Sequence, residues 1–293
     1  MKVHLVDGTY ELFRHHFARP SHVTAAGQEI AATRGVLDSV LYLLAGGATH
    51  VGVATDHVIE SFRNDLWPTY KSSAGMPPEL LSQFGLLEDG LAAMGVTVWP
   101  MVELEADDGL ASAAKVAAAD AAVEQVVICT PDKDLGQCVS GARVVQLDRR
   151  KDVVTDEAGI RAKYGIGPES IPDWLALTGD SADGFPGVPG FGAKTASAVL
   201  ARYTHLEDIP ELGLKWDVPG IRNATRVAAN LADHREHAFL FRDLATLRTE
   251  PPVVDDVETL RWRGPTDTFD DFCASIDGER TAERAKELAT ARA

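Results

Sequence analysis

The chain has 293 residues, of which 45% are hydrophobic, so it is long enough for one large domain and a smaller one. Its 3 cysteines are an odd number without metal-ligand spacing, which favours a reduced, cytoplasmic setting. The formal net charge of −16 argues against a protein that grips nucleic acid through a broadly basic surface. No apolar run approaches the length of a membrane span, so we expect neither a signal peptide nor a membrane protein.

Short β-like runs alternate with helical stretches in the first half of the chain. The expected strands are residues 2–6, 50–54, 96–100, 125–129 and 143–147, and the expected helices are residues 35–44, 79–94 and 107–119. This alternation predicts an α/β fold with a mainly parallel sheet flanked by helices. From about residue 166 to 250 the pattern is helical, which predicts a second, all-helical domain after a first domain of residues 1–165.

The last segment, residues 251–293, is acidic and opens with two prolines. It is either an extra packed element or a partly mobile tail, and the sequence leaves both interpretations open.

Carboxylates follow several of the expected strands, at the edge where an open α/β sheet places its ligands. The candidates are Asp7, Asp56, Glu105, Asp107, Asp108, Asp132, Asp134, Asp180 and Asp183. So many anions can share a pocket only with cations, and hard divalent ions such as Mg²⁺ or Mn²⁺ prefer oxygen ligands. The pattern predicts two divalent metal ions and metal-assisted phosphodiester hydrolysis.

Each group of acids also has a structural explanation. The acids at 105–108 fit the first turn of a helix, those at 132 and 134 fit a loop after a strand, and those at 180 and 183 fit a tight turn. A calcium loop of the EF-hand type is excluded, because the distal Glu of that pattern is absent. Lys133, which stands between two of the acids, is expected to face away from a bound cation.

Three further segments are candidates for contact with a phosphate backbone. Gly187, Gly190 and Gly192 precede Lys194 in a hairpin that feeds a helix, and a phosphate clamp and a simple turn between helices are equally compatible with it. Arg63 and Lys71 flank a polar stretch that is either a solvated loop or a mobile gate. Tyr10 and Arg14 follow Asp7 and are candidates for DNA contact.

Taken in order, the segments VDGTYELFR, SFRNDLWPTYK, ELEADDGLAS, CTPDKDLGQ and ALTGDSADGFPGVPGFGAKTA resemble the 5′-to-3′ exonuclease and flap endonuclease family, which includes the exonuclease domain of bacterial DNA polymerase I. The similarity runs from Met1 to about Glu250. It implies a PIN-like α/β domain, an arch or gateway around residues 62–84, and a helix-3-turn-helix domain that binds DNA.

The resemblance also implies roles for the candidate residues. The first metal would be held by Asp7, Asp56, Glu105, Asp107 and Asp108, and the second by Asp132, Asp134, Asp180 and Asp183. Arg63 and Lys71 match basic gateway positions, with Lys71 near the scissile phosphate. Gly187, Gly190, Gly192 and Lys194 match a hairpin that grips the DNA backbone, often with a monovalent cation such as K⁺.

The chain departs from the family pattern at three places. Gly184 stands where bacterial relatives commonly have Asn, Phe185 where Leu is usual, and no basic residue follows shortly after Lys71. The arch is therefore expected to hold DNA weakly, which agrees with the acidic total.

These observations predict a structure-specific 5′ nuclease that depends on divalent metal and cuts DNA at 5′ ends, flaps or junctions. We expect a stand-alone, monomeric enzyme, cytoplasmic and associated with the nucleoid, that is coupled in function to a separate DNA polymerase. Two alternatives remain, which are a catalytically silent structure-specific DNA-binding protein and a PIN-type ribonuclease.

Overall fold

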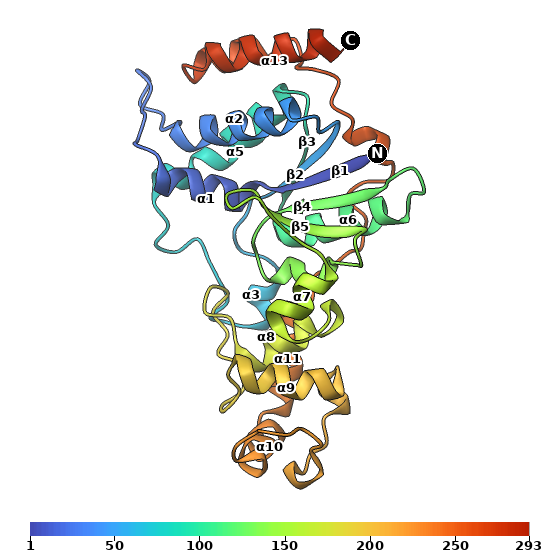
Figure 1. The fold of residues 1–293 in the computed structure, drawn as a ribbon. Coiled ribbons are helices and arrows are strands. Elements are labelled where there is room, and N and C mark those ends of the chain that lie inside the picture. The colour runs from blue at the N-terminus through green and yellow to red at the C-terminus, as the bar shows by residue number, and fades with distance from the viewer. Residues whose placement is uncertain (293) are drawn as a thin grey trace. The chain divides into compact units, whose positions relative to one another are not determined.

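The computed structural model describes residues 1–292, which form two compact units (Figure 1). The first unit contains residues 1–59, residues 73–130 and the chain from residue 248 onward. The second contains residues 60–72 and 131–247, so both units are discontinuous in sequence. None of the helices within the described residues is long and apolar enough to cross a membrane.

The first unit is built on four parallel strands in the order β3-β2-β1-β4. Their bounds are β1 Lys2–Asp7, β2 His50–Asp56, β3 Thr97–Met101 and β4 Gln125–Cys129. Every residue of β2 is buried, as expected for a strand covered on both faces. The prediction of a mainly parallel sheet is confirmed, and each of these strands lies within two residues of its expected range.

Helices cover the two faces of this sheet. They are α1 Gly8–Ala18, α2 Ala31–Ala45, α4 Pro78–Leu81, α5 Gln83–Ala93 and α6 Ala106–Ala119. The helix α6 contacts all four strands, whereas α2 packs with α1 and α5. Because crossovers between parallel strands are right-handed, the return from β3 to β4 places α6 on the face opposite to α1 and α5. The strand order reverses between β1 and β4, where α/β sheets bind their ligands.

Two helices differ from their expected form. The helix α1 was not among the predicted helices, because its buried stripe contains the polar residues Glu11 and His15 and so hides the apolar period. The expected helix at residues 79–94 is divided into α4 and α5. At that division the side-chain oxygen of the buried Gln83 accepts hydrogen bonds from the backbone N–H groups of Ala32 and Thr33, each at 3.0 Å, and so caps α2.

The segment after residue 250 packs onto the first unit, which decides between the two interpretations left open by the sequence. It contains a 3₁₀ turn at Val257–Leu260, α12 Phe269–Ser275 and α13 Glu279–Arg292. Trp262 is buried and donates its indole N–H to the carbonyl oxygen of Met94 at 2.8 Å. Figure 1 shows α13 lying along α2, and Thr281 donates a hydrogen bond to Asp38 of that helix at 2.9 Å.

The second unit is mainly helical. Its helices are α3 Phe62–Leu66, α7 Glu157–Tyr164, α8 Ile171–Thr178, α9 Ala193–Tyr203, α10 Ala224–Asp233 and α11 Arg235–Ala245, joined by 3₁₀ turns at Asp134–Cys138, Pro168–Ser170, Leu206–Asp208 and Gly213–Lys215. The strands β5 Val144–Asp148 and β6 Val153–Thr155 form an antiparallel pair. The short strand β6 was not predicted, since its residues Val153 and Val154 are exposed and it offers no buried face.

One hydrophobic core holds the helices of the second unit together. Leu175, Ala176 and Leu177 of α8 are fully buried against α11, where Phe241 stacks on Phe185 with ring centroids 5.4 Å apart. Phe185 belongs to the turn that carries two of the candidate acids. The core therefore fixes that turn, and with it the direction of its carboxylates.

Candidate metal centre

Asp7 ends β1 and caps α1, so the sheet and the helix together fix its carboxylate. Its Oδ1 accepts a hydrogen bond from the backbone N–H of Tyr10 at 2.8 Å, and its Oδ2 accepts one from the hydroxyl of Thr130 at 2.9 Å. The side chain of Asp7 is only 5% exposed. Thr130 directly follows β4, so this pair lies at the reversal of strand order.

Asp56 links the end of β2 to the start of α6. Its Oδ1 accepts a hydrogen bond from the backbone N–H of Ala106 at 2.6 Å, between Glu105 and Asp107. Its own N–H donates to the hydroxyl of Thr9 at 2.8 Å, two residues after Asp7. These bonds place Asp56 beside the first turn of α1 and the first turn of α6, at the edge of the sheet where the first acidic set is expected. This set consists of Asp7, Asp56, Glu105 and Asp107.

Asp108 takes a different place from its predicted role as a metal ligand. Its side chain is 0% exposed. One oxygen accepts a hydrogen bond from the N–H of Glu105 at 2.9 Å, and the other accepts one from the N–H of Arg248 at 2.7 Å. Both oxygens therefore bind backbone donors. This arrangement makes Asp108 a buried cap of α6 that orients Glu105.

The second acidic set lies in the second unit and consists of Asp132, Asp134, Asp180 and Asp183. Oxygen atoms of Asp134, Asp180 and Asp183 all lie within 4.8 Å of one another. Asp132 Oδ1 accepts a hydrogen bond from the N–H of Asp134 at 2.9 Å, so the two acids share one tight turn. The predicted pairing of these turns is thus present within this unit.

Among these acids, Asp134 has the surroundings that best fit a cation ligand. Its Oδ1 is buried and accepts no hydrogen bond within the described residues. Burial raises the pKa of Asp134 well above its usual range, and the negative charges of Asp132 and Asp183 raise it further. A buried acceptor without a donor is costly, and a bound cation would satisfy this one.

Lys133 directs its ammonium into this set, which corrects the expectation that it faces away. Its Nζ donates a hydrogen bond to Asp180 Oδ2 and lies 3.7 Å from Asp134 Oδ1. Burial alone would lower the pKa of Lys133, but the carboxylates of Asp134 and Asp180 outweigh it and raise that pKa. The ammonium thus acts as a counter-charge where a metal ion would bind.

The side-chain oxygens of both acidic sets are of the type that hard divalent ions bind, and the second set also has the geometry. Both sets offer only carboxylate oxygens, which are the ligands that Mg²⁺ and Mn²⁺ prefer. In the second set the orphaned oxygen of Asp134 and the close approach of three carboxylates give that fit a geometric basis. The chemistry that such a donor set supports is Lewis-acid catalysis on a phosphate ester.

The segment from Trp67 to Lys71 docks onto the turn that carries Asp180 and Asp183. The indole of Trp67 and the hydroxyl of Thr69 both donate to the carbonyl oxygen of Gly184, at 3.1 and 3.0 Å. The N–H of Lys71 donates to the carbonyl oxygen of Asp183 at 3.1 Å. The predicted gateway lysine therefore lies beside the second acidic set.

Gly184 is required by this docking. Its φ is +81°, and a Cβ atom there would lie 1.9 Å from the carbonyl oxygen of Thr69. Gly184, where the resemblance led us to expect Asn, thus lies at a close approach between its own backbone and that of Thr69. Local sequence patterns do not predict this contact, because the two segments are more than 100 residues apart.

Arg63 is buried, in contrast to the expected place on an open gateway. Its side chain is 1% exposed. Its Nε donates to the carbonyl oxygen of Leu244 at 2.7 Å, and its Nη2 donates to that of Thr246 at 3.2 Å. The guanidinium therefore satisfies the C-terminal end of α11 and favours a structural role for this residue.

The hairpin between α8 and α9 keeps its expected form. Gly187 and Gly190 have positive φ values of 73° and 91°, and Gly192 is the N-cap of α9 without a side-chain hydrogen bond to the helix. Lys194 is exposed in the first turn of α9. The hairpin thus presents backbone N–H groups and a cation on one surface, as an anion site would.

Tyr10 and Arg14, the other predicted DNA contacts, lie on α1 and are partly buried. Arg14 Nη2 lies 2.5 Å from an oxygen of Glu11, which is only 1% exposed. The charge of Arg14 is therefore largely used to neutralise a buried carboxylate.

Comparison with known families and structures agrees with this description. A family model described as "5′-3′ exonuclease, N-terminal resolvase-like domain" matches residues 2–165, and "5′-3′ exonuclease, C-terminal SAM fold" matches residues 166–268. A 5′-3′ exonuclease of Buchnera aphidicola subsp. Baizongia pistaciae is 31% identical over 90% of this chain and 87% of its own length. DNA polymerase I of Pseudomonas aeruginosa is 35% identical over 87% of this chain. The chain spans only 28% of that polymerase.

Two solved structures show the same fold. The T5 5′-exonuclease with bound zinc has a TM-score of 0.66 at 20% identity, with 98% of each chain covered. The catalytic core of Rad2 in complex with DNA substrate has a TM-score of 0.65 at 15% identity, with 98% of this chain and 91% of that chain covered. These similarities confirm the expected α/β fold with a second helical domain.

Proposed function

Because the chain belongs to the 5′-3′ exonuclease family, we propose that it is a nuclease that uses divalent metal ions to hydrolyse DNA at 5′ ends or flaps. The observation that carries this proposal is the buried Oδ1 of Asp134, which accepts no hydrogen bond within the described residues and lies in a cluster of three carboxylates. A purely structural acid at that place would have a donor.

The two acidic sets have distinct roles in this proposal. Asp7, Asp56, Glu105 and Asp107 hold one divalent ion, and Asp132, Asp134, Asp180 and Asp183 hold the other. When bound, Mg²⁺ or Mn²⁺ supplies positive charge that activates water and neutralises the charge developing on the phosphate. Asp108 holds Glu105 in place from behind, through the N–H bond at 2.9 Å.

The basic groups of the second unit position the substrate. Lys71, tied through its backbone to Asp183, places an ammonium beside the phosphate that is cut. The hairpin with Gly187, Gly190, Gly192 and Lys194 holds the DNA backbone through its N–H groups, with K⁺ as an additional ligand. Arg63, buried in the second unit, holds the segment that carries Lys71 in place.

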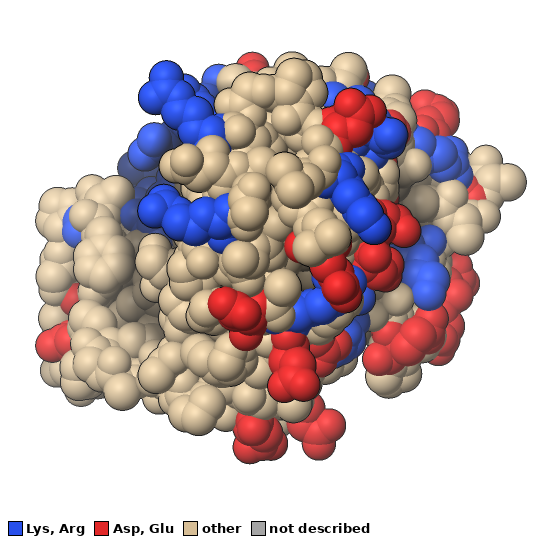
Figure 2. All heavy atoms as spheres, turned by 90° about the horizontal axis from the view of Figure 1, so that it is seen from below, with Lys and Arg blue, Asp and Glu red and all other residues tan. Residues whose placement is uncertain are grey.

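The net charge of −16 does not make the whole surface acidic. Figure 2 shows Lys and Arg side chains gathered in the upper left part of one face, with Asp and Glu more frequent in its lower right part. Such unevenness supports a DNA partner with modest affinity. We propose that the enzyme acts as a monomer in the cytoplasm, at the nucleoid, together with a separate DNA polymerase.

The test compares cleavage of matched DNA and RNA substrates that carry a 5′ flap, with Mg²⁺ or with EDTA. We expect the full chain to cut the DNA flap only with Mg²⁺. Asp134→Asn should lower this cleavage by more than about 100-fold, because it removes a charged metal ligand. Glu211→Gln, an exposed carboxylate of the same unit, is the matched control and should retain the activity.

Each alternative has its own outcome in this test. Binding of the DNA flap without cleavage at any metal concentration would indicate a catalytically silent DNA-binding protein. Preferred cleavage of the RNA substrate would indicate a ribonuclease. Full activity of Asp134→Asn would contradict the assigned metal site.

A further inference from the structure

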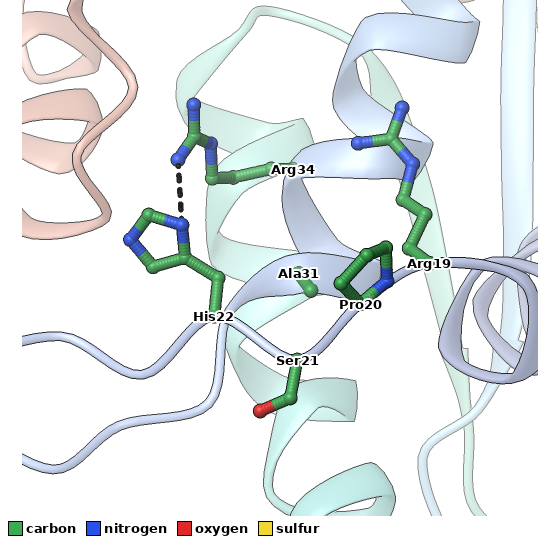
Figure 3. Close-up of a pocket in the computed structure, with 6 residues that line it drawn as sticks. All are labelled: Arg19, Pro20, Ser21, His22, Ala31 and Arg34. Atoms are coloured by element: carbon green, nitrogen blue, oxygen red, sulfur yellow. Dashed lines mark hydrogen bonds between the residues drawn. The ribbon is translucent and has the colours of Figure 1, made fainter.

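A second charged site lies in the first unit, at the far end of α1 from Asp7. The chain leaving α1 and the first turns of α2 enclose a pocket of about 410 Å³ (Figure 3). It is lined by Arg19, Pro20, Ser21, His22, Ala31 and Arg34. No lining residue carries a carboxylate, and the proposed nuclease site uses none of them.

The two guanidinium groups of this pocket are not neutralised by ion pairs. Arg19 is exposed, and its guanidinium forms no ion pair or hydrogen bond within residues 1–292, whereas its backbone N–H donates to the carbonyl oxygen of His15 at 3.0 Å. Arg34 Nη1 donates to Nδ1 of His22 at 3.5 Å, as the dashed line in Figure 3 marks. Nε2 of the same ring lies 3.0 Å from Asp277 Oδ2. Asp277 therefore pairs with the imidazole and leaves the charge of Arg34 available.

The carboxylate of Glu29, which accepts a hydrogen bond from the pocket residue Ser21, is occupied by its own loop. It accepts hydrogen bonds from the hydroxyl of Ser21 and from the backbone N–H groups of His22, Ile30 and Ala31. Burial alone would raise the pKa of Glu29, but these hydrogen bonds outweigh it and lower that pKa, so the group stays ionised. The loop is thus held together internally, and its arginines are left for a ligand.

Gly35 gives Arg19 its position against α2. A Cβ atom at Gly35 would lie 2.5 Å from Nδ1 of His15 and 3.0 Å from Nε of Arg19. In Figure 3 the side chains of Arg19 and Arg34 extend from the two ends of the pocket toward the same side. The absence of a side chain at position 35 therefore leaves room for the ring of His15 and the guanidinium of Arg19 against α2.

We propose that this pocket binds a phosphate group. The planar fork of N–H donors on each guanidinium matches the oxygens of a phosphate, which two unpaired arginines recognise better than any neutral ligand. The phosphate comes either from the backbone of bound DNA or from a free phosphate in solution. The first source rests on the proposed nuclease function, whereas the second is independent of it.

The length of α1 sets where a DNA phosphate would bind. The helix begins directly after Asp7 and has 11 residues, so it is about 16 Å long. A strand that runs along α1 with B-form spacing, about 3.4 Å per nucleotide, brings a phosphate about five nucleotides from the cut to this pocket. This position can be tested one linkage at a time.

The first experiment measures binding of a 5′-flap DNA to the full chain in Ca²⁺, by fluorescence anisotropy over a range of salt concentrations. Arg19→Gln and Arg34→Gln should each weaken binding about 3- to 10-fold and make the slope of log K against log salt shallower by about 0.9. Arg263→Gln is the matched control, because Arg263 is exposed in the same unit and already pairs with Glu258 at 3.2 Å. It should change neither quantity.

A second measurement locates the phosphate in the DNA. A single uncharged methylphosphonate linkage, moved along the strand, should weaken binding of the unmodified protein most at about five nucleotides from the cut. The same linkage should have no further effect on Arg19→Gln, because the contact is already lost. Arg19→Lys keeps the positive charge but lacks the planar fork of N–H donors. The effect of the linkage on its DNA binding should lie between the effects on the unmodified protein and on Arg19→Gln.

The third measurement titrates inorganic phosphate into the protein and follows it by calorimetry. Phosphate binding that the double variant Arg19→Gln/Arg34→Gln loses, without any effect of the methylphosphonate, identifies free phosphate as the ligand. The proposal is overturned if this double variant equals Arg263→Gln in DNA affinity, salt slope and phosphate binding. If the unmodified protein binds the DNA and phosphate as proposed but does not cleave DNA, that result would count against the proposed nuclease function and not against the phosphate site.

Discussion

The two acidic sets differ in how their charges are satisfied. In the first unit Asp7 and Asp56 lie at strand ends and accept hydrogen bonds from neutral donors, such as the hydroxyl of Thr130 on Asp7 at 2.9 Å. Behind them, both oxygens of Asp108 accept backbone N–H groups. In the second unit Asp134 leaves a buried oxygen without a donor, and Lys133 supplies the counter-charge.

In the first set, hydrogen bonds from protein donors hold the carboxylates in place without metal. In the second set, a buried carboxylate oxygen has no donor among residues 1–292, so the folded state is less stable without metal. Hydrogen bonds from neutral donors stabilise ionised carboxylates and fix their direction. Buried carboxylates that face one another destabilise the folded chain until a cation joins them. The second set is therefore where metal binding should contribute most to the stability of the protein.

Removing one carboxylate from each region should have opposite effects on stability. Asp108→Asn leaves a backbone N–H facing an amide N–H in the buried interior, and we expect it to cost about 1–3 kcal/mol. Asp134→Asn removes a buried like charge, so the metal-free protein should become more stable. Thermal unfolding in EDTA measures both, at roughly 2–4 °C for each kcal/mol.

Repeating the unfolding with Mg²⁺ provides the control. The ion should stabilise the unmodified protein and Asp108→Asn, and it should stabilise Asp134→Asn much less. If Asp134→Asn were instead destabilised in EDTA, its carboxylate would be satisfied without metal, and the contrast between the two regions would disappear.

The sequence was sufficient to predict the sheet and the place of most acids, because both follow from local patterns. The run Gln125–Cys129 is so apolar that its bounds were predicted without error, and Asp132 follows it at the expected edge. Residues 8–18 were missed as a helix because the buried face of α1 includes polar side chains. A local sequence pattern does not show that a polar residue is buried when its hydrogen-bond partners come from other segments of the chain.

The roles in the site that the sequence did not predict depend on contacts between distant segments. Asp108 becomes a cap only because the N–H of Arg248 reaches it from 140 residues away. Arg63 becomes buried only because α11 ends over it, with Leu244 as the acceptor. Lys133 turns inward because Asp180 lies there to receive it. The sequence shows which residues are acidic or basic, but the contacts that set the roles of Asp108, Arg63 and Lys133 are visible only in the folded structure.

The counter-charge can be removed without touching a carboxylate. Lys133→Met deletes the ammonium that competes with a metal ion for Asp134 and Asp180, so we expect Mn²⁺ to bind about 3- to 10-fold more tightly, equivalent to roughly 0.7–1.4 kcal/mol. Calorimetric titration of the full chain with Mn²⁺ measures this. Lys151→Met is the matched control, since Lys151 is 62% exposed and pairs only with Asp148 at 3.3 Å. Weaker Mn²⁺ binding by Lys133→Met would show that the ammonium helps to build the site.

The smallest expected effect is a dependence of stability on pH that belongs to Asp134 alone. Its pKa in the folded chain is raised above the ordinary value of 3.8, so between the two values the folded state holds the extra proton. Stability from this group therefore falls as pH rises above about 4, by at most about 1.4 kcal/mol per unit, and levels off above the folded pKa. Carboxylates outside the second acidic set cancel in the difference between Asp134→Asn and the unmodified protein. In EDTA this difference in melting temperature should grow with pH, and saturating Mg²⁺ should reverse it, because the ion replaces the proton. A difference that stays constant with pH would mean that Asp134 is ionised without strain, as the acids of the first set are.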